Sequence, residues 1–175
     1  MAAHGDLRAA EAQYRSKALA TDKKMANGPW LWFAVAVLLF ILDRFLKEIA
    51  IARGADPAPG IAAFSLFRNT GIAFSLPLPP AVFWPAAAVI FAVLLGFFAR
   101  SLTRDLMRAG MLALIILGAA SNLIDRFLYA SIIDYLLFFG RSAVNVADGM
   151  IVAGLVALYA FGTKKDLAST HSVQQ

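Results

Sequence analysis

Apolar residues in this chain are gathered into long runs that are separated by polar or mixed segments. The runs cover residues 30–50, 82–98, 109–128 and 144–161. Each is close to the roughly 20 apolar residues with which an α-helix crosses a hydrocarbon core of about 30 Å. The pattern therefore predicts an all-α integral membrane protein with four transmembrane helices.

The segments outside these runs set the domain organisation. Residues 1–28 and 164–175 are polar, and we expect them to be tails that flank a membrane domain over 29–163. The first connecting segment, 51–80, is rich in proline. Within it, residues 64–74 read as two short extended runs around a glycine, which predicts a small external β-hairpin.

Basic residues predict how the helices are oriented in the membrane. One set of connecting segments and tails carries Lys23, Lys24, Arg100, Arg104, Arg108, Lys164 and Lys165, and the other carries Arg53, Arg68, Arg126 and Arg141. Because cytoplasmic segments are enriched in lysine and arginine, both termini are expected in the cytoplasm. Asp43, Arg44, Lys47 and Glu48 stand in the last part of the first run, where a cleavage site would need small residues. A signal anchor is therefore preferred to a cleaved signal.

Composition agrees with a membrane location and excludes several kinds of site. The 175 residues are 61% hydrophobic and 15% charged, whereas soluble domains are about 45–50% apolar and about 25% charged. Cysteine is absent, and His4 and His171 both lie in the tails. A thiol nucleophile, a thiolate or histidine metal site and a Ser-His-Asp triad are therefore excluded from the membrane domain. The net charge of +5 is better explained by basic residues that set the orientation of the helices in the membrane than by nucleic-acid binding.

Polar residues inside the apolar runs are concentrated toward the external side. They are Asp43 and Lys47 in the first run, Asn122, Asp125 and Arg126 in the third, and Asn145 and Asp148 in the fourth. Asp134 lies between the last two groups in an apolar stretch. An ionisable residue within a span costs about 2.5–3.5 kcal/mol on insertion scales, so such residues are usually paired or functional.

Aspartates are the natural acid–base groups in a site that has neither cysteine nor histidine. Two neighbouring carboxyls share one proton, so that one can activate water while the other polarises a carbonyl, as in aspartic proteases. Spacing alone leaves other roles open. Asp43 and Lys47 can pair within one helix, Asp125 and Arg126 can form a stabilising pair, and Asp148 can cap a helix.

Five motifs occur in an order that resembles the lipoprotein signal peptidases, or signal peptidase II family. They are LDRFLK at 42–47, RNTGIAFS at 68–75, GAASNLIDR at 118–126, IDY at 133–135 and VNVAD at 144–148. The resemblance covers roughly residues 36–160. Each motif alone is weak, but five in the same order are specific.

This resemblance implies a membrane aspartic protease with four spans and a small external β-cradle. It implies that Asp134 and Asp148 are the catalytic dyad and that Asp125 and Arg126 form a supporting pair. Residues implied to shape the site or contact substrate are Asp43, Lys47, Asn69, Gly71, Asn122 and Asn145.

The resemblance also implies a substrate and a location. The substrate is a prolipoprotein whose cysteine carries diacylglycerol, and cleavage occurs just before that cysteine. The enzyme would lie in the bacterial inner membrane among its lipids, with its site near the external face, and would use neither a metal nor another cofactor.

Several positions depart from the family pattern. Ala119 and Ala130 stand where glycines are usual, and Val144 stands where phenylalanine is usual. The segment between Asp134 and Asn145 is short and lacks the expected tryptophan and proline. These changes affect packing and the external lid more than the acids.

Two other functions fit the sequence less well. A small membrane transporter or assembly protein would carry polar residues through the cytoplasmic halves of its spans, but 34–39, 111–117 and 152–158 are almost wholly apolar. A metal-dependent lipid-modifying enzyme would need several carboxylates at helical spacing in one segment, and no run has them. The sequence therefore favours the peptidase.

Overall fold

The structure is a computed structural model that describes residues 2–55, 62–71, 79–138 and 142–173, with side chains at 13, 28–55, 64–71, 79–138 and 142–161. Its elements, in chain order, are α1 (Ala2–Arg53), β1 (Ala62–Asn69), α2 (Pro80–Arg104), α3 (Leu106–Tyr129), β2 (Ile132–Phe138), β3 (Ser142–Val144) and α4 (Val146–Val173). The expected mainly helical architecture is confirmed.

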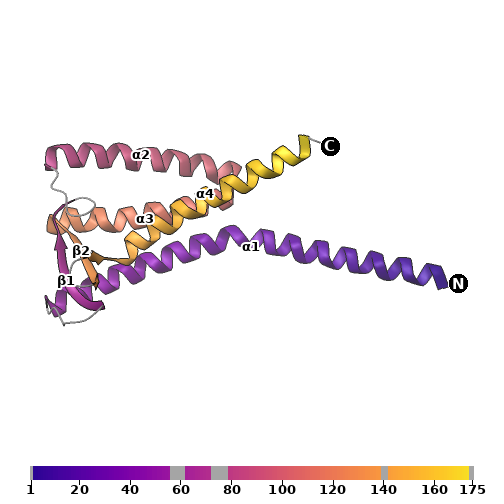
Figure 1. Cartoon of the computed structure of the whole chain (residues 1–175), viewed down its shortest axis with the longest axis horizontal. Coiled ribbons are helices and arrows are strands. Elements are labelled where there is room, and N and C mark those ends of the chain that lie inside the picture. The colour runs from indigo at the N-terminus through magenta and orange to yellow at the C-terminus, as the bar shows by residue number, and fades with distance from the viewer. Residues whose placement is uncertain (1, 56–61, 72–78, 139–141, 174–175) are drawn as a thin grey trace.

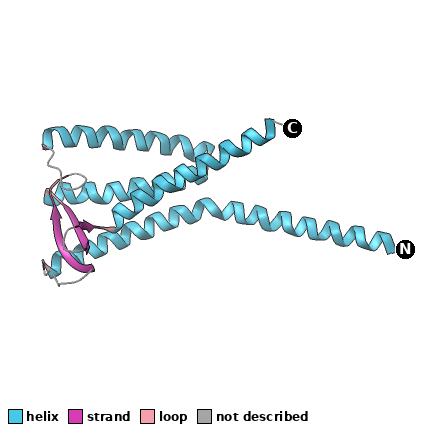
Figure 2. Cartoon of the chain, viewed as in Figure 1, coloured by secondary structure: helices cyan, strands magenta, loops and turns pink. Residues whose placement is uncertain are grey.

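The helices form a bundle that is covered at one end by a small sheet, as Figure 1 shows. The N- and C-termini lie at the opposite end, where α1 and α4 extend away from each other. Helix α3 is central and packs against α1, α2 and α4. Figure 2 shows that the sheet is confined to the end away from the termini.

Close packing of α4 on α3 depends on two glycines. A Cβ atom at Gly118 would lie 2.6 Å from the carbonyl oxygen of Ala147. A Cβ atom at Gly154 would lie 2.5 Å from Cγ1 of Ile115. Small residues let helices approach closely where no hydrophobic effect drives their association. Gly118 therefore sets how near the first turn of α4, which carries Asp148, lies to α3.

Two of the helices are long and apolar enough to cross a membrane, among the residues that the structure describes. They are α2, with a mean hydropathy of 2.3, and α3, with 1.7. The apolar part of α4, Val146–Phe161, is shorter. Helix α2 exposes Val89, Ile90 and Phe97 by more than half, as expected of a lipid-facing helix. Four complete crossings remain a prediction.

The sheet differs from the predicted hairpin. Its strand order is β1-β2-β3, with both pairs antiparallel. Strand β1 pairs with β2, so that Phe67 faces Asp134 and Asn69 faces Ile132. The second extended run of the expected hairpin falls mostly on 72–78, which lies outside the described residues. The prediction missed β2 and β3 because their pairing with β1 joins distant segments, which local patterns do not reveal.

Candidate active site

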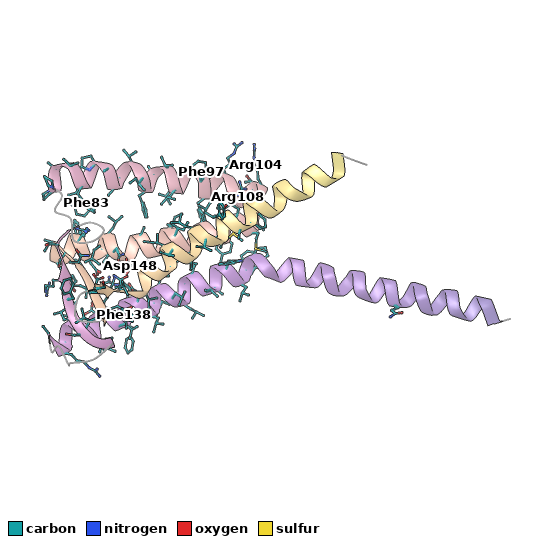
Figure 3. All side chains as sticks on the ribbon, viewed as in Figure 1. Phe83, Phe97, Arg104, Arg108, Phe138 and Asp148 are labelled. Atoms are coloured by element: carbon teal, nitrogen blue, oxygen red, sulfur yellow. The ribbon has the colours of Figure 1, made fainter. Side chains whose placement is uncertain are left out.

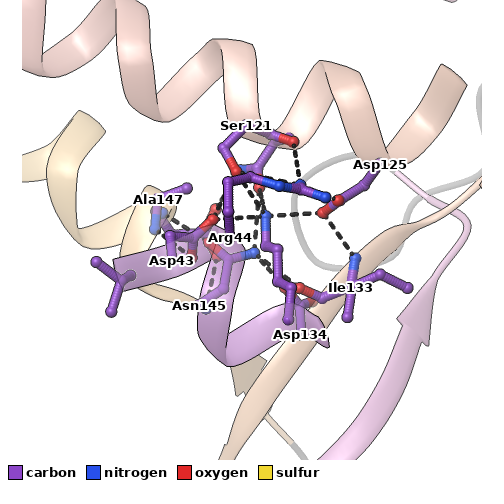
Figure 4. A network of polar contacts seen from close by, with 12 residues as sticks. Asp43, Arg44, Ser121, Asp125, Ile133, Asp134, Asn145 and Ala147 are labelled. Carbon is purple, nitrogen blue, oxygen red and sulfur yellow. Dashed lines mark hydrogen bonds and ion pairs between the residues drawn. The ribbon is translucent and has the colours of Figure 1, made fainter. Parts of the chain in front are cut away.

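The predicted polar residues converge where α1, α3 and α4 meet the sheet. Figure 4 shows this network, in which α1 contributes Asp43 and Arg44, α3 contributes Ser121 and Asp125, and β2 contributes Asp134, while Asn145 stands just before α4. The sequence separates these segments widely, yet hydrogen bonds and ion pairs join them into one cluster.

A fully buried charge cluster links α1 to α3. The Nζ atom of Lys47 lies 2.9 Å from Oδ2 of Asp43 and 2.7 Å from Oδ2 of Asp125, and all three side chains have zero exposure. The Nη1 atom of Arg44 lies 2.5 Å from Oδ1 of Asp125. The predicted pairing of Asp43 with Lys47 is confirmed. Asp125 has cationic partners on α1, not the expected Arg126.

Arg126 has a separate role because successive residues of a helix point about 100° apart. Its guanidinium lies 4.6 Å from the ring centroid of Phe83, at the start of α2. It also donates a hydrogen bond to the backbone carbonyl of Gly71. Gly71 N–H in turn donates to Oδ1 of Asn69 at 3.1 Å. The ion pair of Asp125 with Arg126, which spacing had left open, is not the one that forms, and Arg126 instead connects α3 to α2 and to the segment after β1. The supporting role of both residues stays a prediction.

The start of α4 is capped by residues from three elements. Asp148 N–H donates to Oδ1 of Asn145 at 2.9 Å, and Asn145 N–H donates to Oδ2 of Asp148 at 3.2 Å, which is a reciprocal capping arrangement. Val146 N–H donates to the Tyr135 hydroxyl at 2.9 Å, and Ala147 N–H donates to Oδ1 of Asp43 at 3.1 Å. The capping role that spacing left open for Asp148 is confirmed. Asp43 of α1 also accepts a hydrogen bond from the first turn of α4 and so links the two helices.

Asp134 and Asp148 share one neighbour. Nδ2 of Asn145 donates to Oδ1 of Asp134 at 2.6 Å, while its backbone N–H reaches Asp148. Nδ2 of Asn122 donates to Oδ1 of Asp148 at 2.8 Å. Burial, and then the charge of Asp148, raise the pKa of Asp134 to about 6, against the opposing hydrogen bond from Asn145. This strand carboxyl therefore holds a proton more readily than an ordinary aspartate does.

Both acids face a cavity of about 940 Å³ between α2, α3, α4 and the sheet. Figure 3 shows Asp148 at the sheet end of the bundle, with Phe83 of α2 across from it. Predicted site residues that line the cavity are Asn69, Asn122, Arg126, Asp134 and Asp148. Those that do not line it are Asp43, Lys47, Gly71, Asp125 and Asn145. The first group can contact a bound molecule, whereas the second shapes the site from behind.

Most of the remaining cavity lining is apolar. It includes Phe67, Phe83, Ile90, Phe91, Leu94 and Leu123. A largely apolar cavity that presents two carboxyls suits acid–base chemistry on a molecule with a long apolar part.

Departures from the family pattern fall on the cavity and on a helix end. Ala119 and Val144 both line the cavity, so they bear on what fits there. Ala130 terminates α3 in the left-handed conformation, with φ 53°, where glycine is favoured. The short segment between Asp134 and Asn145 includes 139–141, which lies outside the described residues.

Three residues of the cluster were not expected to belong to the site. Arg44 pairs with Asp125, and Ser121 donates to Oδ2 of Asp43 at 2.6 Å. The Tyr135 hydroxyl donates to Oδ1 of Asp43 at 2.9 Å. Ser121 and Asp125 are one helical turn apart, which was a usable signal. The partners of Arg44 and Tyr135 lie in other elements, so spacing could not reveal them.

The acids of the site are not arranged as metal ligands in the part of the chain that the structure describes. No group of three or more His, Cys, Asp or Glu side chains there could hold a metal ion. Asp43 and Asp125 are instead neutralised by Lys47 and Arg44. The expectation that the enzyme needs no metal or other cofactor remains a prediction.

Comparison with known proteins places the chain in a family. Residues 35–163 match the family model for signal peptidase (SPase) II. The lipoprotein signal peptidase of Pseudomonas paraeruginosa is 31% identical over 160 residues, covering 82% of this chain and 94% of that protein. The lipoprotein signal peptidase of Cupriavidus necator is 31% identical over 150 residues, covering 78% and 85%.

Solved structures support the fold. A bacterial membrane enzyme determined by the in meso method superposes with a TM-score of 0.63, at 21% identity, over 79% of this chain and 90% of that one. A second such enzyme superposes with a TM-score of 0.58 at 20% identity. The architecture is therefore that of a membrane protein. With the match over 35–163 and relatives that align over most of their length, the chain belongs to the signal peptidase II family of proteases.

Proposed function

We propose that this chain is an aspartic endopeptidase that removes signal peptides from diacylglyceryl-modified prolipoproteins, cleaving just before the lipidated cysteine. Signal-peptide removal from lipoprotein precursors follows from the family. The observation that carries the catalytic assignment is that Asp134 and Asp148 reach the same cavity from different elements and share Asn145.

The chemistry needs one proton on the pair. The ionised carboxyl takes a proton from a water molecule, whose oxygen attacks the carbonyl carbon of the peptide bond. The protonated carboxyl donates to the carbonyl oxygen, which gives a neutral tetrahedral intermediate. Collapse of this intermediate breaks the C–N bond, and a carboxyl protonates the departing amine of the cysteine.

The rest of the cavity suits the lipid part of this substrate. The aromatic and aliphatic lining of the cavity is contributed by α2 on one side and by α4 on the other. The polar residues that line the cavity are confined to its end near the sheet. Acyl chains would lie along the apolar part, while the peptide bond would meet the two acids. The surrounding membrane lipid would meet the apolar outer surface of α2.

We assign the site to the external side of the bacterial inner membrane. The termini lie at the end of the bundle away from the sheet, and exposed Arg100, Arg104 and Arg108 stand near the junction of α2 and α3 at that end. The positive-inside rule places that end in the cytoplasm. Four spans within a 29–163 peptidase domain, with cytoplasmic tails at 1–28 and 164–175, complete this topology.

A transporter is less well supported than a peptidase. A transport path would require polar groups along the inner halves of the spans. The buried stretch of α3 from Met111 to Ile116 is wholly apolar, so the polar residues of this helix that belong to the network stop at its outer half.

The test is cleavage of a diacylglyceryl-modified precursor peptide by purified enzyme in lipid. Asp134→Asn and Asp148→Asn should each lower kcat by about a thousandfold or more, since each removes an essential proton carrier. Both variants should insert as the wild type does, and Asp148→Asn should melt at a lower temperature because its new amide group sets a donor against one of the two N–H groups that Asp148 accepts. Glu48→Gln, which alters an exposed carboxylate at the same end of α1, is the control and should cleave normally. Wild-type turnover by either dyad variant would refute the assignment.

A further inference from the structure

Two of the asparagines that donate hydrogen bonds to the dyad acids have orientations that are fixed by their other partners. Oδ1 of Asn122 accepts from Lys47 Nζ at 2.9 Å. An ammonium group has only donors, so the amide oxygen must face Lys47. The Nδ2 group therefore faces Oδ1 of Asp148, at 2.8 Å. Lys47, which does not line the cavity, thus determines which end of the Asn122 amide meets the acid.

Asn145 is fixed in the same way by a backbone donor. Its Oδ1 accepts from Asp148 N–H at 2.9 Å, so its Nδ2 must point elsewhere. That group donates to Oδ1 of Asp134 at 2.6 Å and lies 3.2 Å from Oδ1 of Asn122. Neither amide can reverse without placing two donors face to face.

The two carboxyls are consequently not equivalent. Both oxygens of Asp148 accept N–H groups, Oδ1 from Asn122 and Oδ2 from the backbone of Asn145. Asp148 also stands in the first turn of α4, where the helix dipole favours an anion. Asp134 lies on a strand, is 1% exposed and accepts its 2.6 Å bond at one oxygen only. Asn69 acts on it in the same direction but less strongly than Asn145 does.

The charged groups around the dyad leave this asymmetry in place. On α1 and α3, the anions Asp43 and Asp125 are matched by the cations Lys47 and Arg44. On β2, Tyr135 donates its hydroxyl hydrogen to Asp43. Arg126 of α3 lines the same cavity as the acids. The matched cluster has no net charge. The charge of Arg126 interacts with Asp134 and opposes the asymmetry, but burial, the charge of Asp148 and the hydrogen bond from Asn145 act on Asp134 more strongly. We infer that the two N–H donors and the helix end at Asp148 outweigh Arg126.

We propose that Asp148 is the ionised base that activates water, that Asp134 carries the shared proton, and that Asn122, oriented by Lys47, is the positioning residue that maintains this assignment. The inference rests on the proposed function and deepens it. Asp148 takes the proton of the attacking water while Asp134 donates its own to the carbonyl oxygen. When the C–N bond breaks, the proton on Asp148 passes to the amine, and the former carbonyl hydroxyl returns a proton to Asp134.

The test is the pH profile of kcat/KM for Asn122→Ala. Loss of the Nδ2 donor destabilises the ionised form of Asp148, so the acid limb should move to higher pH by about one unit or more. The alkaline limb, which reports loss of the proton from Asp134, should not move. KM should change little compared with kcat. A purely structural role for Asn122 would lower activity without moving one limb alone.

Asn69→Ala is the matched comparison because it removes the weaker donor near Asp134. It should raise the alkaline limb and leave the acid limb in place. If Asn122→Ala does not fold, the isosteric Asn122→Asp replaces it and should move the acid limb further, because it sets a second carboxylate beside Asp148.

The outcomes separate this inference from the proposed function. If Asp134→Asn or Asp148→Asn still cleaves in the same assay, the proposed function itself fails. If both are inactive but folded Asn122→Ala keeps the wild-type acid limb, or shifts the alkaline limb instead, only the assignment of base and proton carrier is overturned.

Discussion

The buried charge cluster behind the site and the dyad that faces the cavity use the same residue type in opposite ways. Asp43 and Asp125 are completely buried beside the cations Lys47 and Arg44. Asp134 and Asp148 receive their nearest hydrogen bonds from neutral amides and lie against an open volume. The first two carboxyls are occupied by cations away from the cavity, whereas the second two meet neutral donors at the cavity, where a bound molecule could reach them.

Under the proposed assignment, this contrast gives Asp43 and Asp125 a structural role instead of a catalytic one. Asp43 accepts four donors, from Lys47, Ser121, Tyr135 and Ala147, and so joins α1 to α3, to β2 and to the start of α4. The position of Asp148 depends on that junction. The charge cluster therefore positions the dyad. Loss of the cluster should lower the free energy of unfolding more than it lowers turnover by the folded protein.

Of the substitutions that test the contrast between the charge cluster and the dyad, Asp125→Asn should have the largest effect on stability. It removes the counter-ion of Arg44 and one of the two carboxylates at Lys47, and loss of one partner of a buried ion pair costs about 3–5 kcal/mol. Thermal unfolding in lipid should show this loss, while the folded fraction should keep a kcat far above that of Asp134→Asn.

The control for this prediction is Glu48→Gln. Glu48 is 62% exposed and lies 3.8 Å from Arg44, and surface pairs of this kind contribute about 1 kcal/mol or less. If Asp125→Asn melted like the wild type and lost all activity, Asp125 would belong with the dyad instead of the charge cluster.

Gly118→Ala should test the link between packing and the dyad. Its new Cβ would meet the carbonyl oxygen of Ala147 at 2.6 Å and the Cβ atom of Met150 at 3.1 Å, so α4 must shift. Overpacking of this kind costs about 1–3 kcal/mol, and cleavage should fall with it because Asp148 follows Ala147. Gly96→Ala, where nothing lies within 4 Å, should leave cleavage unchanged and should stabilise by about 0.5–1 kcal/mol, because alanine is favoured over glycine inside a helix. Equal behaviour of the two variants would show that Gly118 is not a packing constraint.

Ala130→Gly should have the smallest effect, and it should stabilise. Ala130 adopts φ 53° and ψ 17° at the end of α3, a conformation that glycine adopts more readily. The gain should be about 0.5–1 kcal/mol, seen as a higher melting temperature with unchanged kcat. Ala92→Gly, on an exposed position within α2, should instead destabilise by about 0.5–1 kcal/mol. A fall in melting temperature for Ala130→Gly would contradict this account of the helix end.

The sequence by itself determined the family of the protein and predicted most residues of the candidate site. Runs of apolar residues predicted helices near their observed places, and the absence of cysteine and the placement of both histidines left aspartates as the acid–base groups. The pairing of Asp43 with Lys47 followed from helical spacing alone, because both residues lie on one helix and the geometry of a helix is local.

Only the tertiary structure decided which acid meets which partner. Asp125 pairs with Arg44 and Lys47 of α1, not with its neighbour Arg126, and β1 pairs with β2 in place of a local hairpin strand. Asn145 reaches both Asp134 and Asp148 because a strand and a helix end are brought together. These contacts depend on how separate elements pack, and packing is set by side-chain shapes and buried charges across the whole fold, which a pattern read along one segment does not contain.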